Sequence, residues 1–520
     1  MNKTFNDRNR STMVFWKSNK VVSRAAAMSS SLFLSNNNRR VSKLAFVSTA
    51  ATFLLLASSS ASNHHHAFAF SPSSQPPHKQ TTAKVPTTSN DVQFSFGLIA
   101  DVQWADAEDG SNFAKTVIRH YRGAFENLVA AVDWWKSINK QYKSFNINDD
   151  DHNDNDNDTE LTQRTQQERH SQSLSFIAQL GDIIDGINVG LGQSDQALSL
   201  ALAELDKLGP THCPSINLVG NHELYNFDRK ELSKAKWLRH GNEEYYSFVP
   251  RSGFRIVVLD AYQIALIGHD RDDPRRLEAV ELIRNKNPNI DVDGNGNGKN
   301  WFDGIPKGSP RKTFVPYNGG YGTKQLTWLK NVLEQSFSQN EKVIVLSHVI
   351  IHPKACGGAT MAWDYEQALE ILHSVNKKQR YKSHNNASDS NASDNTVVAV
   401  FCGHDHRGCY HCDDFGIHHC TFSSPLNKGA DGSAYGMVQV SHNALELVGP
   451  CIDDLLPDVG NRPAKQAFDW RNRDDDDVPA DDSRGNFPLE SVVLPFGPAK
   501  SQKDDSESSV MESEPVVKLQ

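Results

Sequence analysis

Chemically reactive side chains occur in five short segments of this sequence, each directly after an apolar run with the composition of a β-strand. The segments supply Asp, Gln, Asn and His, side chains that bind divalent metal ions. Because ligands of open α/β sheets gather where strands end, we expect the segments to meet. They are Asp101-Val102-Gln103, Gly181-Asp182-Ile183-Ile184-Asp185, Gly220-Asn221-His222-Glu223, Ser347-His348 and Gly403-His404-Asp405-His406.

This combination predicts a two-metal site for the hydrolysis of a phosphate ester or anhydride. Two divalent cations about 3.5 to 4 Å apart neutralise phosphoryl oxygens, generate hydroxide near neutral pH and stabilise the leaving oxygen. Asp182 is the predicted bridge, because a carboxylate has two oxygens and this one is central among the segments. The ligands predicted for one ion are Asp101, Gln103, Asp182 and His406, and those for the other are Asp182, Asn221, His348 and His404.

Two further residues are candidates for proton transfer. His222 follows a predicted ligand, and an imidazole beside the phosphate can protonate a leaving oxygen or stabilise its charge. Asp185, three residues after Asp182, is predicted to hold that imidazole in the right tautomer. The alternative for His222 is a helix-capping or structural histidine.

The elements that must position these residues alternate between strand and helix, which predicts an α/β fold. We expect two mixed β-sheets packed face to face with helices outside, a four-layer sandwich. The expected strands are 94–100, 174–180, 216–219, 255–259, 342–346, 397–402, 436–441 and 444–448. The expected helices are 113–135, 193–208, 273–284, 324–337 and 365–375.

One catalytic domain is predicted over residues 91–450, with polar insertions near 148–160 and 383–395 that have too few apolar residues to order. Residues 1–90 are predicted to be a targeting presequence and linker, because a basic start precedes the apolar run 44–57. That run is shorter than the ~20 residues of a bilayer span, so no stable membrane anchor is expected. Residues 451–520 are predicted to be an acidic, disordered tail.

Secretory entry is the favoured route, and a plastid destination is the alternative, because Ala67 to Phe70 resemble a bipartite plastid-import presequence. The net charge of −9, without a block of Lys and Arg, argues against a nucleic-acid partner. A monomer is expected. Four of the seven cysteines lie among histidines in residues 402–420, where a structural zinc site, local disulfides or buried thiols are the alternatives.

The pattern Asp-x-[His or Gln], Gly-Asp-x-x-Asp, Gly-Asn-His-[Glu or Asp], His, Gly-His-x-His resembles the calcineurin-like metallophosphoesterase superfamily. Gln103, where most members have His, resembles the manganese-dependent ADP-ribose/CDP-alcohol diphosphatases of this superfamily. The resemblance extends over residues 92–450 and includes the segments 100–110, 179–186, 220–227, 259–262 and 318–320. A purple acid phosphatase is a poor alternative, because its iron-binding tyrosine falls where this chain has Asp185.

The resemblance implies cleavage of the pyrophosphate of ADP-ribose and of CDP-alcohols of the CDP-choline and CDP-glycerol type. The substrate is then a small nucleoside diphosphate, and the products are a nucleoside monophosphate and a phosphorylated fragment. The implied cofactor is a pair of divalent metal ions, with Mn2+ expected and Mg2+, Zn2+ or Fe as alternatives. An amide oxygen at Gln103, a harder ligand than imidazole, agrees with manganese or magnesium rather than zinc.

Phe113 and Arg119 match family positions near the site, where they could stack on a base and clamp the far phosphate. Their alternative reading is a core Phe and a solvated Arg. Residues 352–361 are expected to form a loop over the pocket, and they depart from the family pattern. A phosphomonoesterase or cyclic-nucleotide phosphodiesterase of the same superfamily is therefore the second hypothesis, and a non-catalytic scaffold is the third.

Overall fold

A computed structural model of the chain describes residues 92–112, 115–144, 173–234, 244–294, 300–385, 395–468 and 489–497. The predicted presequence, the insertion near 148–160 and Phe113 lie outside these residues, as does most of the insertion near 383–395. Within the described part, no helix is both long enough and apolar enough to span a bilayer.

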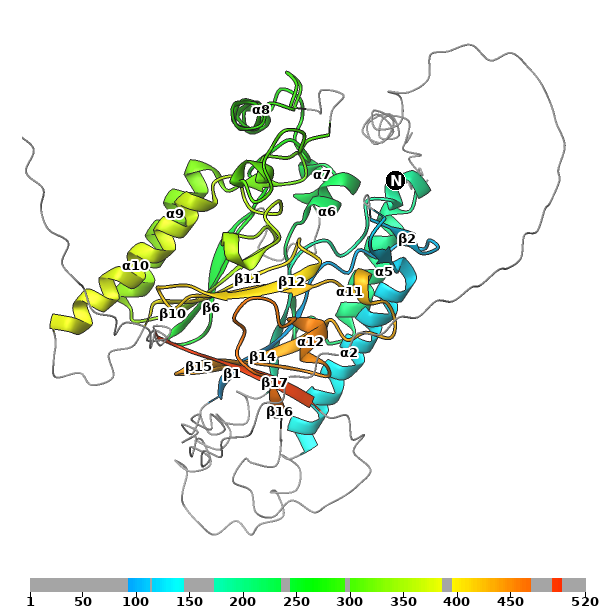
Figure 1. The fold of residues 1–520 in the computed structure, drawn as a ribbon. Helices are drawn as coiled ribbons and strands as arrows, with labels where there is room; N and C mark the ends of the chain where they lie inside the picture. Colours follow the sequence, from blue (N-terminus) through cyan, green and yellow to red (C-terminus); the bar gives the residue numbers. More distant parts are fainter. Residues whose placement is uncertain are drawn as a thin grey trace, which may run out of the picture. The chain divides into compact units, whose positions relative to one another are not determined.

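Two mixed β-sheets form the centre of the domain (Figure 1). The seven-stranded sheet has the order β16-β17-β15-β14-β1-β4-β5, and the six-stranded sheet has the order β12-β13-β11-β10-β7-β6. The first comprises β1 (Val92–Ile99), β4 (Leu174–Gln179), β5 (Ser215–Asn217), β14 (Tyr435–Ser441), β15 (Ala444–Gly449), β16 (Gln466–Phe468) and β17 (Leu489–Pro495). The second comprises β6 (Tyr246–Arg251), β7 (Phe254–Val258), β10 (Lys342–Ser347), β11 (Val397–Cys402), β12 (Arg407–Cys412) and β13 (His418–Ser423).

The two sheets bury a common core between them. Successive side chains of a strand point to opposite faces. In β1, Phe94, Phe96 and Leu98 accordingly all belong to the cluster shared by both sheets. Phe96 stacks on Phe176 of β4, with ring centroids 4.7 Å apart, and lies 6.4 Å from Phe401 of β11 in the other sheet. Alternating apolar residues therefore join the sheets face to face.

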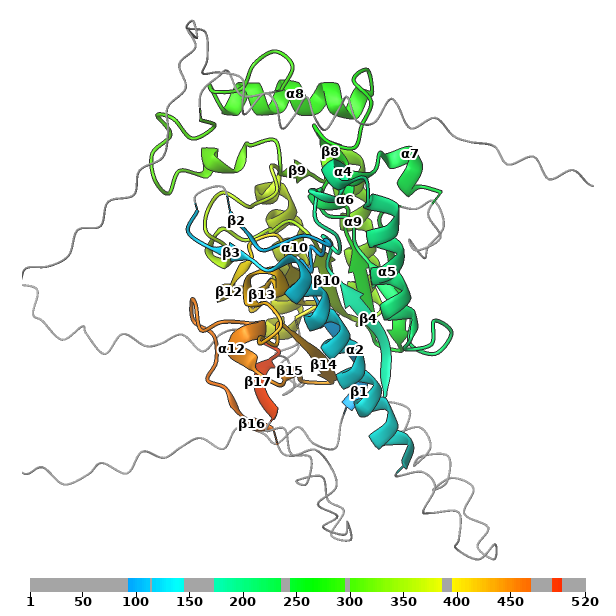
Figure 2. The same cartoon turned by 90° about the vertical axis from the view of Figure 1, so that its right-hand side faces the viewer.

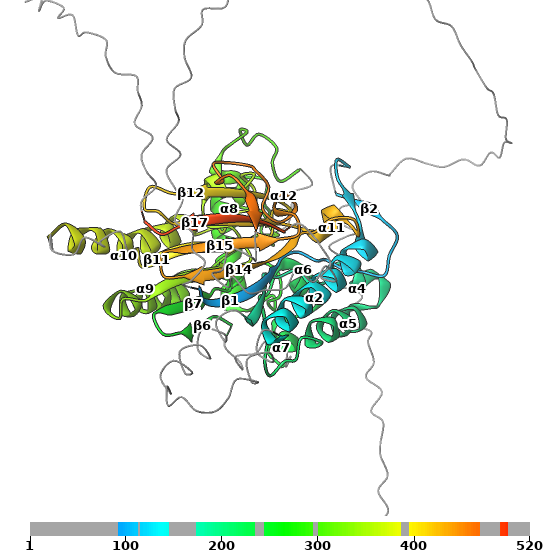
Figure 3. The same ribbon diagram turned by 90° about the horizontal axis from the view of Figure 1, so that it is seen from below.

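Helices cover the outer faces of both sheets, as Figure 3 shows from below. The helices α2 (Tyr121–Ser144) and α5 (Ser194–Asp206) lie side by side on the seven-stranded sheet (Figure 2). The helices α9 (Gly322–Ser338) and α10 (Tyr365–Asn385) pack on the six-stranded sheet. Trp135 of α2 fits against Gly97, where a Cβ atom would lie 2.8 Å from the indole. The predicted four-layer sandwich is confirmed.

The strands that precede the chemical segments run parallel within each sheet. In the seven-stranded sheet these strands are β1, β4 and β5, which are parallel to one another. In the six-stranded sheet they are β10 and β11, which are parallel to each other, and β10 is also parallel to its other neighbour, β7. A smaller substructure beyond these strands contains α8 (Pro274–Lys286), β8 (Ile264–Ala265) and β9 (Gly319–Gly320), and it packs around its own apolar cluster. The architecture thus collects the carboxyl ends of five strands.

The C-terminal part of the chain corrects the predicted domain boundary at residue 450. The helix α12 (Ile452–Leu455) and the strand β17 belong to the domain, and β17 pairs with β15 along its whole length. Val492 and Leu494 of β17 are fully buried in the core between the sheets. The run 489–495 is short and lies between the acidic segments 474–477 and 504–514, so the local composition does not indicate a strand of the domain.

Candidate metal centre

All seven predicted ligands follow the carboxyl ends of parallel strands, and they come from both sheets. From the seven-stranded sheet, Asp101 and Gln103 follow β1, Asp182 follows β4 and Asn221 follows β5, whereas His348 follows β10 and His404 and His406 follow β11 of the other sheet. One ligand atom each of Asp182, His348 and His404 lie within 4.8 Å of one another, and all three side chains are buried. The structure therefore brings together residues that are up to 305 positions apart, Asp101 and His406.

The ligands predicted for the second ion surround His348. Its Nε2 atom lies 3.4 Å from Asp182 Oδ2, 3.3 Å from Asn221 Oδ1 and 3.2 Å from His404 Nδ1. Its Nδ1 atom contacts the carbonyl of Leu180 at 2.8 Å, which leaves the Nε2 lone pair directed at the group. A carboxylate oxygen, an amide oxygen and two imidazole nitrogens thus lie close together, and such a set of donor atoms suits a divalent cation.

The ligands predicted for the first ion meet around Gln103. Its Nε2 atom lies 3.0 Å from Asp182 Oδ2 and 2.8 Å from His406 Nε2, which is 3.8 Å from Asp101 Oδ1. Its Oε1 atom is buried without a hydrogen-bond partner among the described residues. Rotating the amide by 180° exchanges the two atoms and places the oxygen among the ligands. The residues present therefore fit two divalent cations, with Asp182 close to both groups of ligands.

The backbone is strained at four of these ligands. In the described part of the chain only six residues other than glycine have positive φ, and four of them are predicted ligands. A left-handed conformation costs a non-glycine residue roughly 1–2 kcal/mol. Such outliers persist where the surrounding structure fixes them, commonly at functional sites. The four are Asp101 (φ 48°), Gln103 (φ 47°), Asp182 (φ 57°) and His404 (φ 70°).

Two glycines allow the ligand loops to approach one another closely. A Cβ atom at Gly220 would lie 2.0 Å from Asp182 Oδ1, and one at Gly403 would lie 2.4 Å from Asp101 Oδ2. The second approach joins the sheets, because the backbone N–H of His404 donates to both oxygens of Asp101 at 3.0 and 2.9 Å. Glycine is required before these ligands because the neighbouring carboxylate occupies the space of a side chain.

Glu223 holds two of the ligand loops, a role that sequence reasoning did not assign. Its carboxylate accepts the backbone N–H groups of Asp182 at 2.8 Å, Ile183 at 2.7 Å and Gly220 at 2.7 Å. It lies in the first turn of α6 (Asn221–Asn226), directly after β5. Burial raises the pKa of Glu223 to about 7, and the charge of Asp182 adds to this increase. A bound cation would favour its ionised form.

Asn318 orients His404, and this contact was also not predicted. The Oδ1 atom of Asn318 lies 2.7 Å from His404 Nε2, so Nε2 carries the proton and Nδ1 is left to bind a metal ion. The amide nitrogen of Asn318 donates to the carbonyl of Ala359 at 2.8 Å. The loop 352–361, predicted to lie over the pocket, is thereby tied to a residue that touches a ligand.

His222 faces the centre through its Nε2 atom, which lies 4.0 Å from Asp182 Oδ2. Its Nδ1 atom accepts the backbone N–H of Gly186 at 2.8 Å, so the neutral ring carries its proton on Nε2. Asp185 Oδ2 lies 3.3 Å from Nδ1 and can pair with the charged ring. The tautomer is therefore set by Gly186 rather than by Asp185, which differs from the predicted role of this carboxylate.

Arg119 lies near the site but not on the expected helix. It is on the short strand β3 (Ile118–Arg119), just before α2 begins at Tyr121. Its Nη1 atom is 3.6 Å from Asp185 Oδ2, and its side chain is 24% exposed. The guanidinium thus forms an ion pair with a buried carboxylate, without a hydrogen bond between the two atoms, and part of it is accessible to a ligand.

Burial controls the electrostatics of the ligands. It raises the pKa of Asp101 well above its usual range and lowers the pKa of His406 to about 3. Burial also opposes ionisation of Asp182, but the neighbouring His348 and His222 outweigh it and the pKa of Asp182 is lowered. Buried carboxylates this close together need a compensating positive charge, which divalent cations supply.

Comparisons with known proteins agree with this geometry. The family model of calcineurin-like phosphoesterases matches residues 95–408. The human manganese-dependent ADP-ribose/CDP-alcohol diphosphatase is 31% identical over 377 residues, covering 69% of this chain and 91% of that protein. The protein of the same name from Oryza sativa subsp. japonica is 34% identical over 370 residues, covering 71% and 95%.

A solved structure is similar as well. The crystal structure of a dimetal phosphatase from Danio rerio superimposes with a TM-score of 0.53 and 28% sequence identity, covering 69% of this chain and 96% of that one. Fold, site and sequence thus agree along most of the described chain. The chain belongs to the calcineurin-like phosphoesterase family and is homologous to manganese-dependent ADP-ribose/CDP-alcohol diphosphatases.

Proposed function

We propose that this metallophosphoesterase cleaves the pyrophosphate of ADP-ribose and of CDP-alcohols and that Mn2+ is its activating ion. The observation that carries the proposal is Gln103, whose amide lies 3.0 Å from Asp182 and 2.8 Å from His406 in the ligand set. An oxygen ligand in place of imidazole favours manganese or magnesium over zinc. The relatives with the diphosphatase name, matched over about nine tenths of their length, support the same substrate class.

The bound ions would neutralise the phosphate oxygens and lower the pKa of water. The Nε2–H of His222 faces the centre because Gly186 occupies Nδ1, so the neutral ring donates a hydrogen bond that stabilises the charge of the leaving phosphate. Arg119 supplies a positive charge for a second phosphate, because its guanidinium lies beside the centre near Asp185 and is partly exposed. A substrate with two adjacent phosphates would contact both His222 and Arg119.

The predicted partner, compartment and oligomeric state belong to the same proposal. A small nucleoside diphosphate is the proposed ligand, the protein acts as a monomer, and residues 1–90 direct it into the secretory pathway or a plastid. The segment that carries the targeting prediction lies outside the described residues.

The test is release of nucleoside monophosphate from ADP-ribose and CDP-choline by the full chain, with Mn2+, Mg2+ or Zn2+ as the only added cation. We expect activity that is highest with Mn2+ and absent in Asp182→Asn. The matched variant Gln103→His should shift the preference from Mn2+ toward Zn2+, because it restores the imidazole of other family members. Hydrolysis of para-nitrophenyl phosphate without cleavage of either nucleotide would refute the diphosphatase and favour the phosphomonoesterase hypothesis.

A further inference from the structure

A second group of metal-ligating side chains lies on the six-stranded sheet, separate from the seven ligands above. One ligand atom each of His352, Asp413 and His419 lie within 4.8 Å of one another, and all three residues are buried. His352 precedes the short helix η2 (Pro353–Ala355), Asp413 follows β12 and His419 is on β13. Three separate segments of backbone therefore direct ligand-type side chains to one point.

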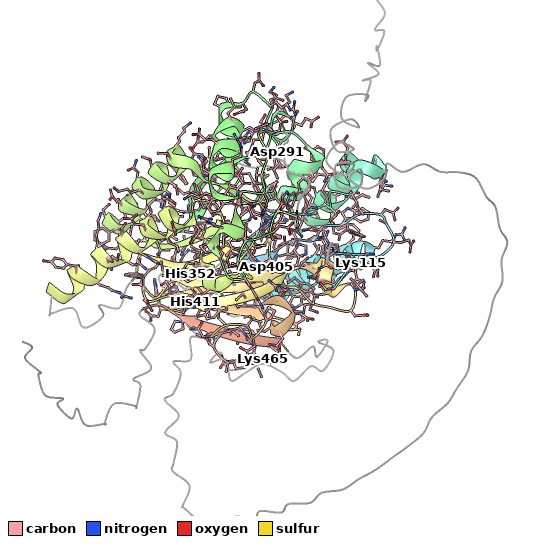
Figure 4. All side chains as sticks on the ribbon, turned by 45° about the horizontal axis from the view of Figure 1, so that its top comes forward. Lys115, Asp291, His352, Asp405, His411 and Lys465 are labelled. Atoms are coloured by element: carbon pink, nitrogen blue, oxygen red, sulfur yellow. The ribbon has the colours of Figure 1, made fainter. Side chains whose placement is uncertain are left out.

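The strand register places a third imidazole beside this group. His411 of β12 is the cross-strand partner of His419 of β13, so both rings project from the same face of the hairpin. The ring of His352 stacks on His411, with centroids 4.5 Å apart, and lies 4.6 Å from the ring of His419. Figure 4 shows His352 and His411 close together. His411 is thus packed on His352, at the edge of the group formed by His352, Asp413 and His419.

The hydrogen bonds orient this group as a binding site. Asp413 Oδ1 accepts two backbone N–H groups, both at 2.9 Å, which fixes the carboxylate. Its Oδ2 atom lies 3.0 Å from His419 Nε2, close to the roughly 3.3 Å between two ligands of a tetrahedral zinc ion with 2.0 Å bonds. His373 Nε2 of α10 lies 2.9 Å from the same Oδ2 atom, and a hydrogen bond between them can orient the carboxylate.

The protein alone does not satisfy these rings. The ring of His419 has a protein partner on one side only, because Nε2 contacts Asp413 Oδ2 and Nδ1 is buried without a hydrogen-bond partner among the described residues. His352 Nδ1 accepts the backbone N–H of Lys354 at 3.1 Å, which leaves Nε2 for another partner. His352 and His419 are at least nine-tenths buried, an environment that favours the neutral ring. Neutral imidazole is the form that binds a metal ion.

The cysteines nearby do not complete a zinc site of the type the sequence suggested. Cys409 and Cys412 are three residues apart on β12, so their side chains point to opposite faces of the sheet. Cys412 packs against the core between the sheets, whereas Cys409 lies near the carbonyl of Lys354. All seven cysteines are among the described residues, and none forms a disulfide. A zinc site in this region would therefore have histidine rather than cysteine ligands.

We propose that His352, His411, Asp413 and His419 bind one zinc-type transition-metal ion that joins the loop 352–361 to the β12–β13 hairpin. Three imidazoles and a carboxylate match the four-coordinate ligand sets of Zn2+. The ion has a structural role, because the same loop bonds to Asn318, which orients His404. It thereby stabilises one wall of the metallophosphoesterase site and is independent of the substrate proposed for that site.

The experiment measures Zn2+ bound per chain, after chelator treatment and equilibrium dialysis of the full protein. It uses an Asp182→Asn background to weaken binding at the dinuclear centre, and adds His352→Gln or His411→Gln. We expect each added substitution to lower Zn2+ binding by one equivalent per chain or its affinity at least tenfold. The control His418→Gln, on the other face of β13, should keep the ion, because His418 contacts Tyr410 and Pro495.

Circular dichroism and thermal unfolding accompany the metal analysis. His411 is only partly buried, so its Gln variant is expected to fold, and Zn2+ should raise the unfolding temperature of the control but not of this variant. If His352→Gln and His411→Gln bind Zn2+ with the stoichiometry and affinity of the control, the proposal is wrong. Failure of the nucleotide assay would leave this result unaffected, because no substrate is involved.

Discussion

Replacing Glu223 by Gln tests whether this carboxylate holds the ligand loops. One oxygen accepts the N–H groups of Asp182 and Gly220, and the other accepts that of Ile183. A Gln side chain can keep the first two bonds with its oxygen, but its NH2 group then faces the N–H of Ile183. Since a hydrogen bond to a charged group contributes about 1.5–3 kcal/mol, we expect the free energy of unfolding to fall by about 2–3 kcal/mol.

The same substitution should weaken Mn2+ binding by roughly 10- to 100-fold, because it moves the loop that carries the bridging ligand. Urea unfolding measures the first effect and titration calorimetry with Mn2+ measures the second. Asp364→Asn is the matched control, since Asp364 is partly buried and its carboxylate also accepts backbone N–H groups, those of Tyr321 and Gly322 at the start of α9. The control should lose stability and keep its Mn2+ affinity. Equal Mn2+ affinities for Glu223→Gln and the control would refute the reasoning.

Three other substitutions or deletions test separate parts of the structure. Gly403→Ala, with its Cβ 2.4 Å from Asp101 Oδ2, should reduce Mn2+-dependent activity on the order of 100-fold, and full activity would disprove the close approach. Asp260→Asn breaks a buried bidentate pair with Arg229 and should cost about 3–5 kcal/mol in urea unfolding at pH 7. Burial opposes ionisation of Asp260, but the charge of Arg229 outweighs burial and lowers the pKa of Asp260. The difference in unfolding free energy between wild type and Asp260→Asn should therefore shrink below about pH 4, where the carboxylate becomes protonated. A difference that does not change with pH would contradict this explanation. A chain ending at residue 468 lacks β17 and should lose about 1.5–3 kcal/mol for each buried Val or Leu removed, which an unchanged unfolding temperature would exclude.

The strands and the ligands after them could be predicted because both leave strong local signals. An apolar run followed directly by Asp, Asn or His identifies a strand and its functional end together, and β11 has the predicted bounds, 397–402. The face-to-face arrangement follows from the two-residue period of strands such as β1. The sequence shows a glycine before Asn221 and before His404. It does not show that the carboxylates of Asp182 and Asp101 occupy the space where a side chain would lie at these two glycines.

Other features could not be predicted because they depend on backbone groups or on distant partners. The tautomer of His222 is set by the N–H of Gly186, which every residue except proline also has. Arg119 was expected on a helix, but that helix begins only at Tyr121. Asn318 orients His404 from 86 residues away, and no local pattern encodes that contact.

The position of β17 also determines the order in which the protein can fold. Domains are synthesised from the N-terminus, so β15 emerges before the strand that pairs with it. Until residues 489–495 arrive, β15 presents an open edge of unpaired backbone groups, to which other chains can add. The nascent protein therefore still has an open sheet edge after all the ligands of the metal centre have been made.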